Sequence, residues 1–211
     1  MASLKQQSPL IQVELDSLER NISAGSENQL SVVEGPLLAY VNIRGRLDNS
    51  DFVSAAETVL GTALPKDNNT FVNHADLTIL WFGPDEWLVL APAGKQVKLL
   101  SALRNAFTDL FAAVTDVTGG YTCVDISGSA ATDLLRKGST IDFHPSVFGV
   151  GQCVQTLLGK TGVAIYKSSD TPSFRVVFRR SFADYLGLWL IDASREFMQD
   201  AEPVIIYQVS S

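Results

Sequence analysis

The sequence is poor in the residues that build metal centres and disulfide frameworks. Its 211 residues include only two cysteines, Cys123 and Cys153, and two histidines, His74 and His144. The cysteines form no C-x-x-C pair, so we expect two free thiols in a reducing cytoplasm. The histidines lie far apart in the chain without neighbours at metal-ligand spacing. A solvated or helix-capping role is therefore favoured over a two-histidine metal site.

Clusters of positive charge and long apolar runs are missing as well. The formal net charge is −7, and Arg136-Lys137 and Arg179-Arg180 are the only basic pairs that stand out. Nucleic-acid binders carry a basic face, so no nucleic-acid partner is expected. Residues 1–10 lack the apolar core of a secretory leader, and the apolar cluster 186–191 is too short to cross a bilayer. We expect a soluble, cytoplasmic protein with no membrane partner.

The most informative stretch is an apolar hairpin at residues 78–90. It reads Thr-Ile-Leu-Trp-Phe-Gly-Pro-Asp-Glu-Trp-Leu-Val-Leu, two β-forming runs around the turn residues 83–86. Side chains alternate across a strand, yet both faces of these runs are apolar. The hairpin is therefore predicted to lie in the middle of a sheet that is covered on both sides.

Two rounds of elements follow the same order along the chain. The first round predicts a strand, a helix with Ser50 as N-cap and Gly61 at its C-terminus, the hairpin and a second helix: residues 37–43, 51–60, 78–90 and 94–111. The second predicts a strand, a short helix capped by Ser129, three strands and a helix that starts at Ser181: residues 122–126, 129–138, 153–158, 161–166, 174–178 and 181–197. A terminal strand is predicted at residues 204–207.

The repeated order predicts an α+β fold with mostly antiparallel sheets, built from two similar β-α-β-β-α modules. We expect an N-terminal arm at residues 1–34, a first module at 35–112 and a second at 113–211. Residues 16–29 are polar and predict a loop. The arm should gain order only by lying on a partner. Helices grouped on one face of each sheet would leave the other faces to meet each other or another protein.

One candidate for chemistry is a thiol nucleophile. Cys153 or Cys123 would attack, His144 would act as base, and Asp142 or Asp125 would orient the histidine. Both cysteines lie in apolar, strand-like runs, where thiols are usually inert small hydrophobes. The inert role is favoured.

Three further patterns also favour structural roles. Gly149-Val150-Gly151 lacks the third glycine and the following helix of a dinucleotide loop, which favours a tight turn. Asp85 and Glu86 are neighbours at a turn tip and not a separated acid/base pair. The aromatic residues Trp81, Phe82 and Trp87 could stack a flat ligand such as a pterin, but core packing is the commoner use.

An ordered succession of motifs resembles the gamma subunit family of bacterial heterotetrameric sarcosine oxidase. The motifs are Gly-Pro-Asp-Glu-Trp-Leu-Val-Leu at 83–90, Asp-Leu-Leu-x-Lys-Gly at 133–138, Asp-Phe-His-Pro at 142–145, Gly-x-Cys-x-Gln-Thr-Leu-Leu-Gly at 151–159 and Arg-Ser-Phe-Ala-Asp-Tyr-Leu at 180–186, with Trp189-Leu190 after them. The resemblance covers about residues 35–198.

The resemblance implies a fold similar to the folate-binding aminomethyltransferases. It also implies a complex that oxidises sarcosine to glycine, with hydrogen peroxide and methylenetetrahydrofolate as further products. FAD, FMN, NAD, zinc and tetrahydrofolate would belong to the alpha, beta and delta subunits, and this chain would be a non-catalytic partner with no catalytic, cofactor or metal residue of its own. The alternative is a stand-alone folate-binding aminomethyltransferase-like enzyme or carrier. A carboxylate facing a pocket between the modules would mark that alternative.

Overall fold

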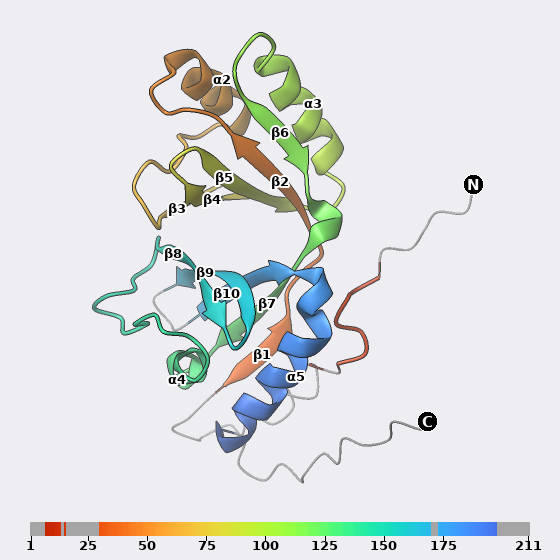
Figure 1. Cartoon of the computed structure of the whole chain (residues 1–211), viewed down its shortest axis with the longest axis vertical. Coiled ribbons are helices and arrows are strands. Elements are labelled where there is room, and N and C mark those ends of the chain that lie inside the picture. The colour runs from red at the N-terminus through yellow and green to blue at the C-terminus, as the bar shows by residue number, and fades with distance from the viewer. Residues whose placement is uncertain (1–6, 14, 16–29, 170–172, 198–211) are drawn as a thin grey trace, which may run out of the picture.

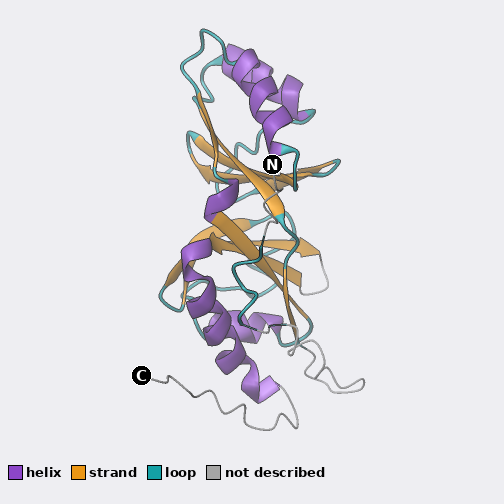
Figure 2. Cartoon of the chain, turned by 90° about the vertical axis from the view of Figure 1, so that its right-hand side faces the viewer, coloured by secondary structure: helices purple, strands orange, loops and turns teal. Residues whose placement is uncertain are grey.

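The chain folds into four layers, with a pair of helices on each outside and two antiparallel sheets between them. This arrangement comes from a computed structural model that describes residues 7–13, 15, 30–169 and 173–197. Figure 2 shows the two sheets in the middle and the long helices at the two ends. The predicted loop at 16–29 and the predicted strand at 204–207 lie outside the described residues.

The first sheet has the order β3-β4-β5-β2-β6. Its central hairpin pairs β4 with β5 around the predicted turn at 83–86, and a β-bulge between Trp81 and Gly83 places Trp81, and not Phe82, opposite Trp87. The hairpin has sheet neighbours on both sides, which confirms its predicted position. The strands are β2 (Leu38–Arg44), β3 (Phe71–His74), β4 (Leu77–Gly83), β5 (Glu86–Pro92) and β6 (Ala113–Asp116).

The second sheet has the order β1-β7-β10-β9-β8. Read from the other edge, this order repeats that of the first sheet strand for strand, with β1 in the place of β6. The repetition confirms the α+β fold of two similar antiparallel modules. The strands are β1 (Ser31–Glu34), β7 (Tyr121–Ser127), β8 (Cys153–Leu158), β9 (Thr161–Ser169) and β10 (Ser173–Arg179).

The edge strands β1 and β6 belong to sheets to which the sequence did not assign them. β1 pairs with β7, and β6 pairs with β2. All of the first sheet is therefore inserted between two neighbouring strands of the second sheet (Figure 1). Relative to the predicted boundaries, 31–34 joins the second sheet and 113–116 joins the first. The division into an arm and two modules itself stays a prediction.

The helices cover the outer faces of the sheets. They are α2 (Ser50–Leu60) and α3 (Gln96–Ala106) on the first sheet, and α4 (Ala131–Arg136) and α5 (Ala183–Ser194) on the second, with short 3₁₀ turns at η1 (Thr118–Gly120), η2 (Arg180–Phe182) and η3 (Arg195–Phe197). The opposite faces of the sheets meet in a shared inter-sheet core, which is the first of the two arrangements considered from the sequence. This core contains Tyr40, Phe71, Leu80, Leu88, Leu90, Cys123, Cys153, Ala164, Tyr166 and Val177.

Helix ends differ from the predictions. Asn49, and not Ser50, caps α2, because its side chain accepts hydrogen bonds from the backbone N–H groups of Asp51 and Phe52. Gly61 ends α2 with φ of 74°, as predicted. Neither Ser129 nor Ser181 occupies an N-cap, since Ala130 precedes α4 and Phe182 precedes α5. Each helix begins two residues after the serine that was predicted to cap it, because a short turn lies between them.

Some residues predicted to face inward are exposed. Val97 is 72 % exposed on α3, although Leu100 and Leu103 of the same helix are buried. Phe182, just before α5, and Tyr185 on α5 are more than one-third exposed, while Leu186 is fully buried. The helical period identified the buried stripe, but the ends of each stripe extend beyond the sheet that covers it.

The described part of the N-terminal arm packs on this chain itself. Leu10, Val13 and Leu15 are buried in the core between the second sheet and α5. Gly187 on α5 makes room for the arm, because a Cβ there would lie 2.5 Å from Cγ1 of Val13. The prediction that the arm gains order only on a partner is therefore wrong for residues 7–13 and 15.

None of the described helices is long and apolar enough to cross a membrane.

Candidate functional site

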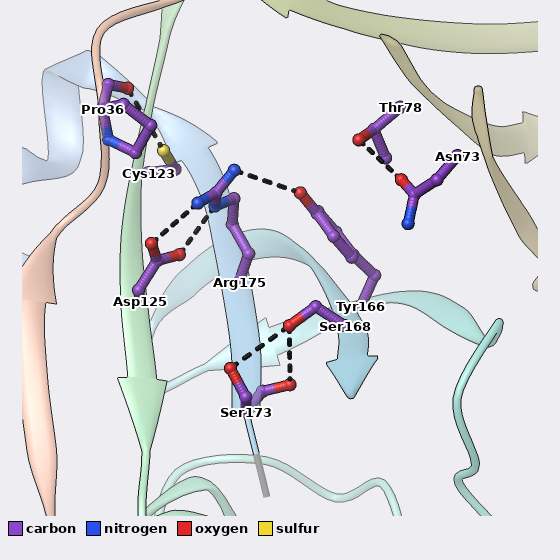
Figure 3. A network of polar contacts seen from close by, with 9 residues as sticks. All are labelled: Pro36, Asn73, Thr78, Cys123, Asp125, Tyr166, Ser168, Ser173 and Arg175. Carbon is purple, nitrogen blue, oxygen red and sulfur yellow. Dashed lines mark hydrogen bonds and ion pairs between the residues drawn. The ribbon is translucent and has the colours of Figure 1, made fainter. Parts of the chain in front are cut away.

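Charged groups inside the inter-sheet core form the most organised polar site of the described residues. Asp125, Arg175 and Tyr166 lie opposite one another on the neighbouring strands β7, β10 and β9. Arg175 donates to both carboxylate oxygens of Asp125, at 2.6 and 2.7 Å, and to the hydroxyl of Tyr166 at 3.4 Å (Figure 3). The two charged side chains are only 24 % and 30 % exposed. A charged pair at this position orders three strands facing the first sheet.

The electrostatics of this row of residues favour a structural ion pair. Hydrogen bonding to Asp125 raises the pKa of Arg175, so the guanidinium stays charged. Burial raises the pKa of Tyr166, so its phenol stays neutral. Two hydrogen bonds join the guanidinium to the carboxylate and fix the orientation of both groups. The carboxylate of Asp125 is therefore not available as a general base. Sequence reasoning missed this pairing, although an arginine between Phe174 and Val176 was a signal, since charged residues in apolar strands need partners.

The two cysteines are buried and carry free thiols. Cys153 Sγ donates to the carbonyl oxygen of Thr70 at 3.1 Å, which ties β8 to the segment before β3. Burial raises the pKa of Cys153 to about 12 and that of Cys123 to about 11. The thiolate is the reactive form of cysteine, so burial suppresses the reactivity of both residues at neutral pH.

The proposed base is not beside either thiol. His144 is exposed, and its Nδ1 lies 2.6 Å from Oγ of Ser146. Asp142 accepts a hydrogen bond from the backbone N–H of His144 and not from its ring. Asp125 is committed to Arg175 and not to a histidine. The structure therefore does not assemble the predicted thiol, base and orienting carboxylate into one site.

The remaining histidine and the glycine pair hold local structure. His74 ends β3 and lies next to Gly61, where a Cβ would lie 3.0 Å from Nε2 of the ring. Gly149 and Gly151 form a tight turn that leads directly into β8, and Gly151 has φ of 88°. The predicted turn is confirmed. In the described residues, no group of three or more His, Cys, Asp or Glu side chains is placed to bind a metal ion.

The three aromatic residues of the hairpin do not line a common ligand-binding pocket. Trp87 is fully buried on the helix side of the first sheet, where its Nε1 donates to the carbonyl of Pro65 at 2.9 Å. Phe82 packs instead against the inter-sheet core. Trp81 is half-buried. Side chains on opposite faces of one hairpin cannot sandwich a single ring, so the core-packing interpretation fits Trp87 and Phe82.

A hollow of about 300 Å³ opens between the two sheets. Arg179 covers the ring of Tyr121 at 4.3 Å, and Gln155 Nε2 donates to the carbonyl of Phe82 at 2.5 Å. The residues lining this hollow are Phe82, Tyr121, Gln155, Thr156, Gly162, Val163, Ala164, Val177 and Arg179. They include no aspartate or glutamate, so this hollow lacks the carboxylate expected of a folate-binding enzyme.

The turn of the central hairpin carries the neighbouring carboxylates. Glu86 pairs with Arg44 and accepts from Asn42 Nδ2 at 2.8 Å, which fixes the end of β5 to β2. Asp85 is exposed beside it. The structural role favoured for this pair fits Glu86.

Comparisons with known proteins agree on one family. The model of the sarcosine oxidase, gamma subunit family matches residues 44–196. The sarcosine oxidase subunit gamma of Corynebacterium sp. (strain P-1) is 34 % identical over 165 residues, which are 78 % of each chain. The subunit gamma of an Arthrobacter sp. is 34 % identical over 147 residues, covering 68 % of this chain and 70 % of that one.

Solved structures extend the similarity to nearly the whole chain. A chain of the heterotetrameric sarcosine oxidase from Corynebacterium sp. U-96, in complex with pyrrole 2-carboxylate, matches with a TM-score of 0.83 and 27 % identity, over 93 % of this chain and 98 % of that chain. The glycine cleavage system aminomethyltransferase T from Bartonella henselae matches with a TM-score of 0.57 and 13 % identity, over 79 % of this chain and 46 % of that chain. The second match confirms the predicted aminomethyltransferase-like fold. The first, with the family match over residues 44–196, shows that the chain belongs to the sarcosine oxidase gamma subunit family.

Proposed function

We propose that this chain is the gamma subunit of a heterotetrameric sarcosine oxidase and acts as a non-catalytic structural and assembly subunit. The complex would convert sarcosine to glycine, with hydrogen peroxide and methylenetetrahydrofolate as further products. The observation that carries the proposal is the match over 98 % of a chain of a solved heterotetrameric sarcosine oxidase. A match of that extent leaves little of the solved chain without a counterpart here.

The state of the candidate reactive groups supports the non-catalytic role. Cys153 and Cys123 hold their protons far above neutral pH because they are buried. The charge of Asp125 is neutralised by Arg175, and His144 lies at the surface next to Ser146. Each group therefore contributes to holding the two sheets or a loop in place.

The cofactors of the proposed complex would be held by its other chains. In this proposal FAD, FMN, NAD, zinc and tetrahydrofolate would bind to the alpha, beta and delta subunits. The side chains around the inter-sheet hollow, with Arg179 stacked on Tyr121 and Gln155 bound to the backbone of β4, already have partners within the chain. This supports a closed body whose outer surfaces meet the partners.

Co-expression of this chain with the alpha, beta and delta subunits tests the proposal. With the full chain, the four subunits should co-purify and oxidise sarcosine; without it, the companion subunits should assemble poorly. A complex that contains the Cys153→Ala and His144→Ala variants should keep the activity of the wild type. Retained activity would also eliminate the thiol-nucleophile hypothesis.

Measurements on the chain alone provide the opposing result. Isothermal calorimetry should detect no binding of tetrahydrofolate, and assays should detect no turnover of sarcosine. Tight folate binding, or turnover without any companion chain, would replace the proposal with the stand-alone folate-binding enzyme or carrier.

A further inference from the structure

One aromatic side chain is held out of the fold by the backbone around it. Phe111 is 89 % exposed, the largest value for a large apolar side chain among the described residues. Asp109 precedes it with φ of 66°, and the next hydrogen bonds run from Leu110 N–H to the carbonyl of Phe107 and from Ala112 N–H to that of Leu110. Leu110 and Ala112 pack against the core of the first sheet. The turn therefore fixes Phe111 outward between two anchored neighbours.

Hollows of about 370 and 440 Å³ flank this side chain. Both are lined by Arg46, Asp85 and Phe111, so the side chain of Phe111 borders both hollows. We use the name Phe111 surface for the residues Arg46, Leu47, Pro84, Asp85, Leu110 and Phe111. A fixed aromatic ring with a recess on each side, surrounded by polar groups, has the organisation of an interface hot spot.

Among the residues that line the two hollows, one carboxylate has no counter-charge within the described part of the chain. Arg46 Nε donates to Asp48 at 2.9 Å, and Arg44 pairs with Glu86. Asp85 makes no ion pair with any of the described residues and is exposed. A complementary surface would therefore bring a positive charge to Asp85.

We propose that the Phe111 surface docks a companion subunit of the oxidase. The docking segment places apolar side chains in the two hollows beside Phe111 and a lysine or arginine against Asp85. The inference rests on the proposed function, because that function supplies the companion chains. A second copy of this chain is a poorer occupant, since a two-fold contact brings the Asp85 carboxylates of both copies to the same interface, and the chain carries a net charge of −7.

Two variants of the full chain, each with a matched control, test the assignment. Phe111→Ser removes the ring, and Val97→Ser removes another exposed apolar side chain, 72 % exposed at the other end of α3. Asp85→Arg reverses the unpaired charge, and Asp67→Arg makes the same change at another exposed carboxylate. Each is co-expressed with the companion subunits, and its affinity for them is measured by surface plasmon resonance.

We expect Phe111→Ser and Asp85→Arg each to weaken association at least tenfold, while Val97→Ser and Asp67→Arg bind as the wild type does. Circular dichroism should show that all four variants are folded. If one of the two test variants misfolds, the other still tests the surface assignment. Wild-type association that neither tested variant weakens would overturn the surface assignment and leave the proposed function standing. Absence of wild-type association would overturn the proposed function itself. Dimerisation of the isolated chain that Phe111→Ser abolishes would identify a second copy as the occupant and also overturn the assignment.

Discussion

Removing one partner of the ion pair between Asp125 and Arg175 should destabilise the second sheet strongly. Asp125→Asn keeps the shape of the side chain and removes its charge, which leaves the guanidinium without a counter-charge in the inter-sheet core. Breaking a fully buried pair costs about 3–5 kcal/mol, and an exposed pair contributes about 0–1 kcal/mol. The side chains here are 24 % and 30 % exposed, so we expect a loss of about 2–3 kcal/mol of unfolding free energy.

The assay is urea unfolding of the isolated chain, followed by tryptophan fluorescence. For a chain of this size, each kcal/mol shifts the thermal midpoint by roughly 2–4 °C, so calorimetry should show a decrease of about 4–12 °C. The matched control is Asp48→Asn, which removes the charge from an ion pair whose side chains are 68 % and 66 % exposed. That control should change the unfolding free energy by less than about 1 kcal/mol.

A double substitution separates the effect of the stranded charge from the effect of lost packing. Asp125→Leu combined with Arg175→Met replaces the pair with apolar side chains, and it should be less destabilising than Asp125→Asn alone. If Asp125→Asn costs no more than Asp48→Asn, the pair is solvated and the reasoning about its burial is wrong.

Three further predictions concern the N-cap of α2, the contact of Gly187 with the N-terminal arm and the buried thiol of Cys153. Asn49→Ala should cost about 1 kcal/mol in urea unfolding, while Ser50→Ala leaves stability within about 0.5 kcal/mol, and equal losses would contradict the assigned cap. Gly187→Ala should displace Val13, so limited proteolysis should cleave the N-terminal segment sooner than in the wild type. An unchanged cleavage rate would show that the close contact at Gly187 does not hold the arm. Burial raises the pKa of Cys153 from about 8.5 in an unfolded chain to about 12, so the unfolded state holds fewer protons between these values. This contribution to stability is complete below pH 8.5 and falls by up to about 1.4 kcal/mol per pH unit above it; the Cys153→Ala variant should lose less stability between pH 9 and 11 than the wild type, and equal slopes would contradict the shift.

The sequence predicted the elements well where side-chain periodicity was strong. The hairpin at 78–90 appears in the structure because both of its faces are apolar, and helices cover one face while the second sheet covers the other. The strands from Cys153 onward and the duplicated order also appear. Periodicity predicts which residues share a face, but not where the covering layer ends. Val97 and Tyr185 follow the helical pattern and nevertheless lie beyond the sheet they were expected to contact.

The local sequence pattern could not predict which strands the edge strands pair with, nor that Asp125 pairs with Arg175. Ser31–Glu34 finds its partner in β7 and not in the neighbouring β2, which is a tertiary choice between distant segments. Asp125 and Arg175 were visible as charges in apolar strands, but only the register of β7 against β10 makes them face each other. The position of Asn49 as cap was equally undecided, because asparagine and serine are both good caps.

The insertion of one sheet into the other has a consequence for synthesis on the ribosome. β1 leaves the exit tunnel early, but β7, its sheet partner among the described strands, is translated after the whole of the first sheet. At about 5–20 residues per second, β1 waits several seconds with an unsatisfied backbone edge. From this order of synthesis we expect the inserted sheet to fold while the nascent chain is still growing, and the second sheet to close only after β7 has emerged. A pause in translation after β7 has left the exit tunnel should therefore favour correct closure, whereas a pause while β7 is still inside the ribosome prolongs the exposure of β1 to other nascent chains.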